Sequence, residues 1–244
     1  MGALRPGDWL IAGICILGVG VLVAIELHAP AGRSLLEGGV LAVLLSVGRT
    51  LPLVGLGVAL GLSGNRNIAA AVLLFVPAAI LSFLERERIL FALLAGPETS
   101  YRLYLIDPLA CLLAGLALVT PDQFRSWTLP PLAASIGAIA IFSIKLIDPG
   151  AGAPAFLEGA VAAALWLILL LALVARRLAG HWFDISARIL GSWLIAIGLL
   201  LGGAGLAQRA VTYAPVSQPA PSLPGIPEKP VTRHQFPGVN PGAE

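Results

Sequence analysis

Charge is scarce in this chain of 244 residues. Only 11% of the residues are charged and 58% are hydrophobic, whereas about 25% are charged in an average soluble domain. A soluble protein with so few charges would leave much of its surface apolar. This composition excludes an ordinary soluble globule, a disordered regulator, a coiled coil and a collagen-like fibre. The remaining class is a polytopic membrane protein whose main partner is the lipid bilayer.

Residues that bind metals or carry redox chemistry are also few. The two cysteines, Cys15 and Cys111, both lie in apolar runs and form no CxxC pair. The three histidines fall in expected loops or in the tail, so no helix face collects histidine with carboxylates. We therefore expect no metal site and no cofactor. The net charge of +2 and the absence of a lysine and arginine cluster exclude nucleic acid as a partner.

Long apolar runs dominate the rest of the sequence. A helix that crosses the ~30 Å hydrocarbon core needs about 20 apolar residues, and continuous rather than alternating runs favour helices. We expect an all-α transmembrane bundle of about seven spans, within a range of about six to eight. The expected spans are Trp9–Leu27, Leu35–Leu62, Ile68–Leu84, Tyr101–Thr120, Leu129–Ile147, Ala155–Ala175 and Arg188–Ala207. The first run is longer than the apolar part of a signal peptide, so we expect it to be retained.

The second expected span is too long for one upright crossing. Its 28 residues would extend about 42 Å as a continuous helix. Near its middle, Gly48 and Pro52 weaken the helix, because proline removes a backbone donor. We favour a single kinked and tilted helix. The alternative is a hairpin of two half-helices, which would leave backbone groups at its tip hard to satisfy.

The composition changes near Val211, where proline becomes frequent. Eight of the nineteen prolines lie between Pro215 and Glu244. Four of them recur at every third residue: Pro221, Pro224, Pro227 and Pro230. This spacing matches one edge of a polyproline II helix, which protein partners recognise, although a solvated tail without a partner is the alternative. We expect residues 1–210 to form the membrane domain and residues 211–244 to form a disordered tail.

Two segments of the chain resemble each other. Leu35–Val40 reads LLEGGV and Phe156–Val161 reads FLEGAV, and each begins an expected span after a loop of glycine, alanine and proline. The resemblance leads to the hypothesis of an internal repeat of helix pairs, which is a common ground plan of transporters. With seven spans the two copies would point in the same direction. With a hairpin at the second span they would be inverted.

Ionisable groups at membrane depth cost several kcal/mol, so each is a candidate functional residue. Arg49 lies near the middle of its apolar run. We expect it to face the protein interior, with Asp107, Glu37 or Glu158 as its acidic partner. The alternative places Arg49 at the tip of a hairpin, in solvent.

Asp107 is the second candidate. Tyr104, Asp107 and Cys111 lie at i, i+3 and i+7 and therefore share a helix face, and Pro108 removes a backbone donor beside them. A carboxylate in that place could bind a cation or carry a proton. The alternative is that Asp107 caps a helix whose first residue is Pro108.

Two glutamates complete the set of candidates. Glu37 and Glu158 each lie near the start of an expected helix, where the helix dipole favours acidic residues. A structural role explains either one alone. Their shared position in the suspected repeat keeps both as candidates for a functional path.

The candidate path therefore consists of Arg49, Asp107, Glu37, Glu158 and Tyr104. It leads to the hypothesis of a small permease, or ion- or proton-coupled transporter, in a bacterial inner membrane. The alternative is a non-catalytic accessory or assembly protein that holds partners through its helix faces and its tail. No Walker loop, GxSxG, HExxH or dinucleotide fingerprint is present, so we do not expect an enzyme. A homo-oligomer is compatible with the small-residue faces of the last span.

Overall fold

The computed structural model describes residues 34–94, 105–147, 153–178 and 180–212, together with residues 13, 16, 18–21 and 23. The regular structure of these ranges is entirely α-helical, as predicted. The helices are α2 (Leu35–Leu44), α3 (Val47–Gly61), α4 (Asn65–Leu84), α5 (Arg86–Leu94), α7 (Ile106–Val119), α8 (Asp122–Ile147), α9 (Pro154–Leu178) and α10 (His181–Thr212). Tyr104, residues 213–244 of the tail and most of the expected first span lie outside the described residues.

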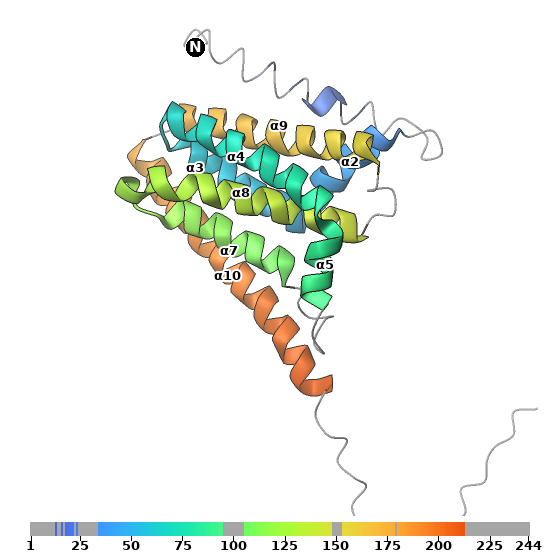
Figure 1. Ribbon diagram of the computed structural model, residues 1–244. Helices are drawn as coiled ribbons and strands as arrows, with labels where there is room; N and C mark the ends of the chain where they lie inside the picture. Colours follow the sequence, from blue (N-terminus) through green and yellow to red (C-terminus); the bar gives the residue numbers. More distant parts are fainter. Residues whose placement is uncertain are drawn as a thin grey trace, which may run out of the picture.

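Three short connections join consecutive helices of the bundle: α3 to α4, α7 to α8, and α9 to α10 (Figure 1). The helices that pack most extensively are other pairs, α4 with α8 and α7 with α10. Gly48 lies beside Asp107 and Gly55 beside Ala114, so α3 and α7 run in the same direction. The contacts of α3 with α9 advance in the same way along both helices. The three short connections therefore lie at one end of the bundle, which we call the turn end. The opposite end, where α2 meets α3, is called the break end.

The centre of the bundle is α3, which contacts α7, α8, α9 and α10. The residues of α3 from Gly55 to Gly61 are all buried. A Cβ atom at Gly57 would lie 2.9 Å from the carbonyl oxygen of Ile168, which is closer than real Cβ atoms approach. Small residues are needed there because they let the backbones of two helices come together.

Several of the described helices have the length and composition of membrane spans. Four of them, α4, α8, α9 and α10, are long and apolar enough to cross a membrane, and the bent pair of α2 and α3 makes a fifth if it is one span. Large apolar side chains are exposed on the outside of the bundle; examples are Leu73, Leu84, Phe91, Leu199 and Leu200. So many exposed apolar side chains are typical of a surface that faces lipid. The structure therefore supports a multi-pass membrane protein with four or five described spans, and the expected count of about seven is not confirmed.

The second expected span is broken rather than smoothly kinked. The axes of α2 and α3 are bent by 73° at Leu45 and Ser46. The break precedes the stretch from Gly48 to Pro52, where we expected it, and Pro52 lies buried inside α3. Ser46 has extended backbone angles and its carbonyl accepts the first hydrogen bonds of α3, so it acts as the N-cap of a new helix.

Candidate functional site

Arg49 lies in the first turn of α3, directly after the break, and only 7% of the residue is exposed. Its guanidinium donates hydrogen bonds to the carbonyl oxygen of Ala42 at 2.7 Å, to the hydroxyl of Ser143 at 3.0 Å and to the carbonyl oxygen of Ser143 at 3.2 Å. Ala42 belongs to the last turn of α2, where the final carbonyls have no donor within their own helix. Arg49 therefore joins α2, α3 and α8 at the break.

Arg49 lies closer to one end of the helix bundle than its place in the middle of an apolar run indicates. Ser143, its partner on α8, is the residue before Ile144, at which the apolar stretch of that helix ends. Because the second span is broken, the middle of its sequence is not the middle of the bundle. Arg49 is buried close to the break end.

Asp107 lies in the first turn of α7, which begins at Ile106. The helix therefore starts before Pro108, whose missing N–H costs little in a first turn because those groups have no helical acceptor. A Cβ atom at Gly48 would lie 3.4 Å from an oxygen of the Asp107 carboxylate. The carboxylate thus adjoins the N-terminal turn of α3 while it sits on the N-terminal turn of α7. Both helix ends attract negative charge.

The fold brings Arg49 and Asp107 to neighbouring positions, since Asp107 lies beside Gly48, the residue before Arg49. Cys111, one turn further along α7, is buried. We define Arg49, Asp107 and Ser143 as the polar cluster of the break end. Tyr104, the remaining member of the expected helix face, lies outside the described residues.

Glu37 and Glu158 lie near the point where α2 crosses α9. The backbones approach so closely there that a Cβ atom at Gly39 would overlap the carbonyl oxygen of Phe156, and one at Gly159 would overlap that of Leu36. These two contacts show that the related segments run in opposite directions where they cross. Glu158 is exposed and Glu37 is partly exposed, so both are at the surface of the break end.

Glu37 has a clear structural role as part of a capping box at the start of α2. The Ser34 hydroxyl accepts a hydrogen bond from the Glu37 N–H at 3.3 Å, and the Glu37 carboxylate accepts one from the Ser34 N–H at 2.8 Å. This reciprocal pair satisfies donors that a helix start would otherwise leave without partners.

We expect Ser34→Ala to lower the free energy of unfolding by about 1 kcal/mol, because it removes the N-cap acceptor of α2. Glu37→Gln keeps a side-chain oxygen that can cap, so we expect its stability to stay close to that of the original protein. Reversible unfolding in mixed detergent micelles measures both. A larger loss for Glu37→Gln than for Ser34→Ala would show that the charge of Glu37 has a role beyond the cap.

The turn end holds polar contacts that sequence reasoning did not single out. Arg176, near the end of α9, donates hydrogen bonds to the side-chain oxygen of Asn65 and, at 2.9 Å, to the carbonyl oxygen of Ser63. Its link to the α3–α4 connection depends on how α9 lies along α3, and no local sequence pattern encodes that.

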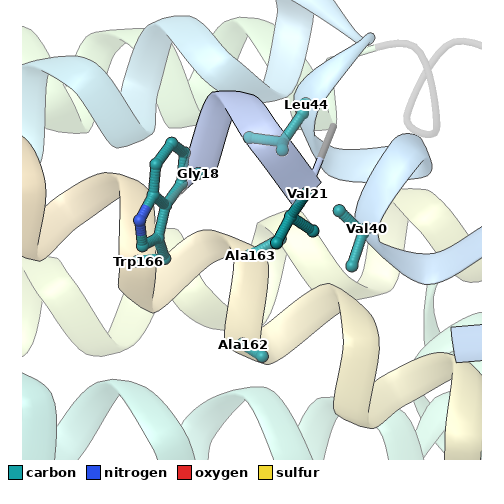
Figure 2. A pocket seen from close by; sticks show the side chains of 7 residues that line it. All are labelled: Gly18, Val21, Val40, Leu44, Ala162, Ala163 and Trp166. Atoms are coloured by element: carbon teal, nitrogen blue, oxygen red, sulfur yellow. The ribbon is translucent and has the colours of Figure 1, made fainter. Parts of the chain in front are cut away.

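A small apolar cavity of about 160 Å³ lies where Gly18 and Val21, at the two ends of the described stretch 18–21, meet α2 and α9 (Figure 2). The cavity is lined by aliphatic side chains, by Gly18 and by the ring of Trp166. Apart from the indole N–H of Trp166, which is buried and has no hydrogen-bond partner among the described residues, such a lining offers no polar group to a solute. The cavity is therefore distinct from the polar cluster, and we assign it to helix packing.

Among the described residues, no group of three or more histidine, cysteine, aspartate or glutamate side chains is placed to hold a metal ion. Comparison of this chain with protein families, with curated proteins and with solved structures finds no match. The function must therefore be argued from the geometry of the polar cluster.

Proposed function

We propose that this protein is a small permease of the ion- or proton-coupled type in the cytoplasmic membrane of a bacterium. The observation that carries the proposal is a buried arginine at a broken helix, with a carboxylate beside the start of the second half. Broken helices are a recurrent way to place polar groups in a membrane protein, because the ends of the two halves offer unpaired backbone groups to an ion or a substrate.

The roles of the two charged residues follow from their contacts. Arg49 holds the C-terminal end of α2 to α8 through Ala42 and Ser143, so it sets the geometry of the break. Asp107 is partly exposed and remains reachable for a cation or a proton. In the proposal Asp107 is the group that binds the coupling ion, and Arg49 is the positioning residue that keeps the two half-helices in register.

Glu37 and Glu158 stand at the surface of the same end of the bundle. Two acidic side chains near an opening raise the local concentration of cations, an effect that salt screens. In the proposal they line the entrance to the path and are not the binding group. Their removal should therefore lower the rate of entry more weakly than the removal of the Asp107 charge.

Proton flux into liposomes tests the proposal directly. The full chain is reconstituted in liposomes that contain a pH-sensitive dye, and a potassium diffusion potential set by valinomycin drives proton entry. We expect the original protein to acidify the lumen at least about tenfold faster than empty liposomes. We expect Asp107→Asn, which preserves the shape of the side chain, to reduce this rate to background; a tenfold loss corresponds to about 1.4 kcal/mol.

Glu85→Gln is the matched control, because Glu85 is an acid at the break end that pairs with the exposed Arg88 on the same turn of the chain. It removes one negative charge without touching the polar cluster, so its flux should equal that of the original protein. The proposal fails if Asp107→Asn conducts as well as the original protein, or if the original protein conducts no better than empty liposomes in proton and in sodium gradients.

A further inference from the structure

A second feature of the fold lies at the turn end, away from the polar cluster. Because α4 packs mainly on α8, and α9 on α2 and α3, α4 and α9 touch each other only sparsely. A groove of about 560 Å³ runs between them. Its walls are apolar and include Ile68 and Ala69 of α4 together with Leu169 and Leu173 of α9. Ala69, Leu169 and Leu173 are exposed, so the groove opens to the outside of the bundle.

The two ends of this groove differ in polarity. At the turn end it is lined by Asn65 and by Arg176, which hydrogen-bond to each other. At the inner end it is lined by the indole ring of Trp166. The groove therefore has one cationic end and is apolar along the rest of its length.

The length of the groove matches one leaflet of a bilayer. Trp166 and Arg176 both belong to α9 and are ten residues apart, which corresponds to about 15 Å along the helix. This is half of the ~30 Å hydrocarbon core of a membrane. An acyl chain whose headgroup lies at Arg176 would therefore reach Trp166 near the middle of the bilayer.

We propose that the groove between α4 and α9 is a binding site for one acidic phospholipid. The headgroup phosphate lies against the guanidinium of Arg176, which has five N–H donors and uses only part of them on Asn65 and Ser63. One acyl chain fills the apolar slot beside Ala69 and Leu173 down to Trp166. The second chain belongs to the surrounding bilayer. The site does not depend on the polar cluster or on the proposed transport.

Native mass spectrometry of the full chain in detergent, stripped of lipid, tests this site. The probes are dioleoyl phosphatidylglycerol, which is acidic, and dioleoyl phosphatidylcholine, which has no net charge. We expect the protein to bind one molecule of phosphatidylglycerol at least about tenfold more tightly than phosphatidylcholine, a difference of about 1.4 kcal/mol. Arg176→Gln should remove this preference, and Arg176→Lys, which keeps the charge, should retain most of it.

Matched control variants separate the groove from general effects on the membrane surface. Arg188→Gln removes an exposed arginine from α10 and should leave both affinities unchanged. Ala69→Phe fills the groove and should weaken both lipids about tenfold, whereas Ala196→Phe, the same change on the exposed face of α10, should not. Ala69 and Ala196 are both exposed, so neither phenylalanine has to enter the core.

Four results would overturn the proposal. The first is equal binding of the two lipids, and the second is an unchanged preference for phosphatidylglycerol in Arg176→Gln. The third is displacement of the lipid by millimolar inorganic phosphate alone. The fourth is that Ala69→Phe only abolishes a concentration-dependent dimer and leaves lipid binding unchanged. The third result would assign the site to a free anion and the fourth to a second copy of the chain. If Arg176→Gln loses its fold, Arg176→Lys and Ala69→Phe still decide the outcome.

Discussion

Replacement of Gly39 by alanine should cost about 3 kcal/mol of stability, while the same change at the adjacent Gly38 should be tolerated. A Cβ atom at Gly39 would overlap the carbonyl oxygen of Phe156 and lie 2.9 Å from the backbone nitrogen of Ala160. Both are backbone atoms of α9, which cannot move without shifting the helix. At Gly38 the nearest neighbour is the ring of Phe156 at 3.4 Å, an ordinary contact with a side chain that can adjust.

Gly159 makes the reciprocal contact with Leu36 of α2, so Gly159→Ala should be as costly as Gly39→Ala. The destabilising effects of the two substitutions should overlap, because one shift of α2 away from α9 makes room for both new methyl groups. We therefore expect the double variant to lose clearly less than the sum of the two single losses. Such a result would identify the crossing as one structural unit.

Equilibrium unfolding in mixed detergent micelles measures these differences. Gly203→Ala on α10 is a second control, because nothing lies within 4 Å of a Cβ atom there and alanine favours helix more than glycine by up to about 1 kcal/mol. Gly203→Ala should therefore be as stable as the original protein or more so. Equal stability of Gly39→Ala and Gly38→Ala would contradict the described crossing of α2 and α9.

The adjacent glycines show what the sequence could predict and what it could not. The LEGG and LEGA segments are visible as a resemblance, and continuous apolar runs predict the helices themselves. The expected span Ile68–Leu84 corresponds to α4, and Ala155–Ala175 corresponds to α9. The choice between Gly38 and Gly39 depends on which of them packs against the backbone of α9. That is decided by contacts with Phe156 and Ala160, which lie on the order of half the chain length away in the sequence.

Helix ends were predicted less well than helix cores, for a physical reason. The last span was expected from Arg188, but α10 begins at His181, where the carbonyl of Gly180 accepts the first hydrogen bonds. A prediction from hydropathy finds only the apolar part of a helix, so it misses the polar turns at the helix ends that lie outside the hydrocarbon core. For the same reason α8 begins at Asp122, well before the expected Leu129.

The position of the break could not be read from local sequence either. Gly48 and Pro52 are the residues that weaken a helix, yet the chain bends at Leu45 and Ser46. A proline in the second turn of α3 leaves only the carbonyl of Gly48 without its usual donor. The bend is favoured instead by distant groups, because α2 crosses α9 closely and Arg49 binds the end of α2 to α8.

Because Arg49 holds the two sides of the break together, we expect Arg49→Ala to lower the free energy of unfolding by about 3 to 5 kcal/mol. The substitution removes a donor from the partly buried carbonyl oxygen of Ala42 and from the buried carbonyl oxygen of Ser143, and it opens a cavity between three helices. Arg49→Lys keeps the charge, but one ammonium group cannot match the planar fork that reaches both carbonyls. We expect it to lose about half as much, roughly 2 kcal/mol.

Arg125 provides a matched control, since it is also 7% exposed and also hydrogen-bonds to a backbone carbonyl, that of Thr120. Its acidic partner Asp122 has 84% of its side chain exposed and therefore stays hydrated when the arginine is removed. We expect Arg125→Ala to cost less than Arg49→Ala, about 1 to 2 kcal/mol, because it leaves only one part-buried carbonyl without this donor and removes a buried Nε–H that has no partner among the described residues. A loss at Arg49 no larger than that at Arg125 would contradict the role of Arg49 at the break.

Arg49→Lys also separates stability from transport. If the variant folds and inserts like the original protein but its proton flux falls together with that of Asp107→Asn, the geometry of the break is needed for ion movement and not only for folding. If its flux equals that of the original protein while its stability falls, Arg49 is a structural clamp and Asp107 alone carries the proposed coupling.

Ser143→Ala should cost about 1 kcal/mol of stability, because it removes one acceptor of the Arg49 guanidinium and leaves both hydrogen bonds to carbonyl oxygens in place.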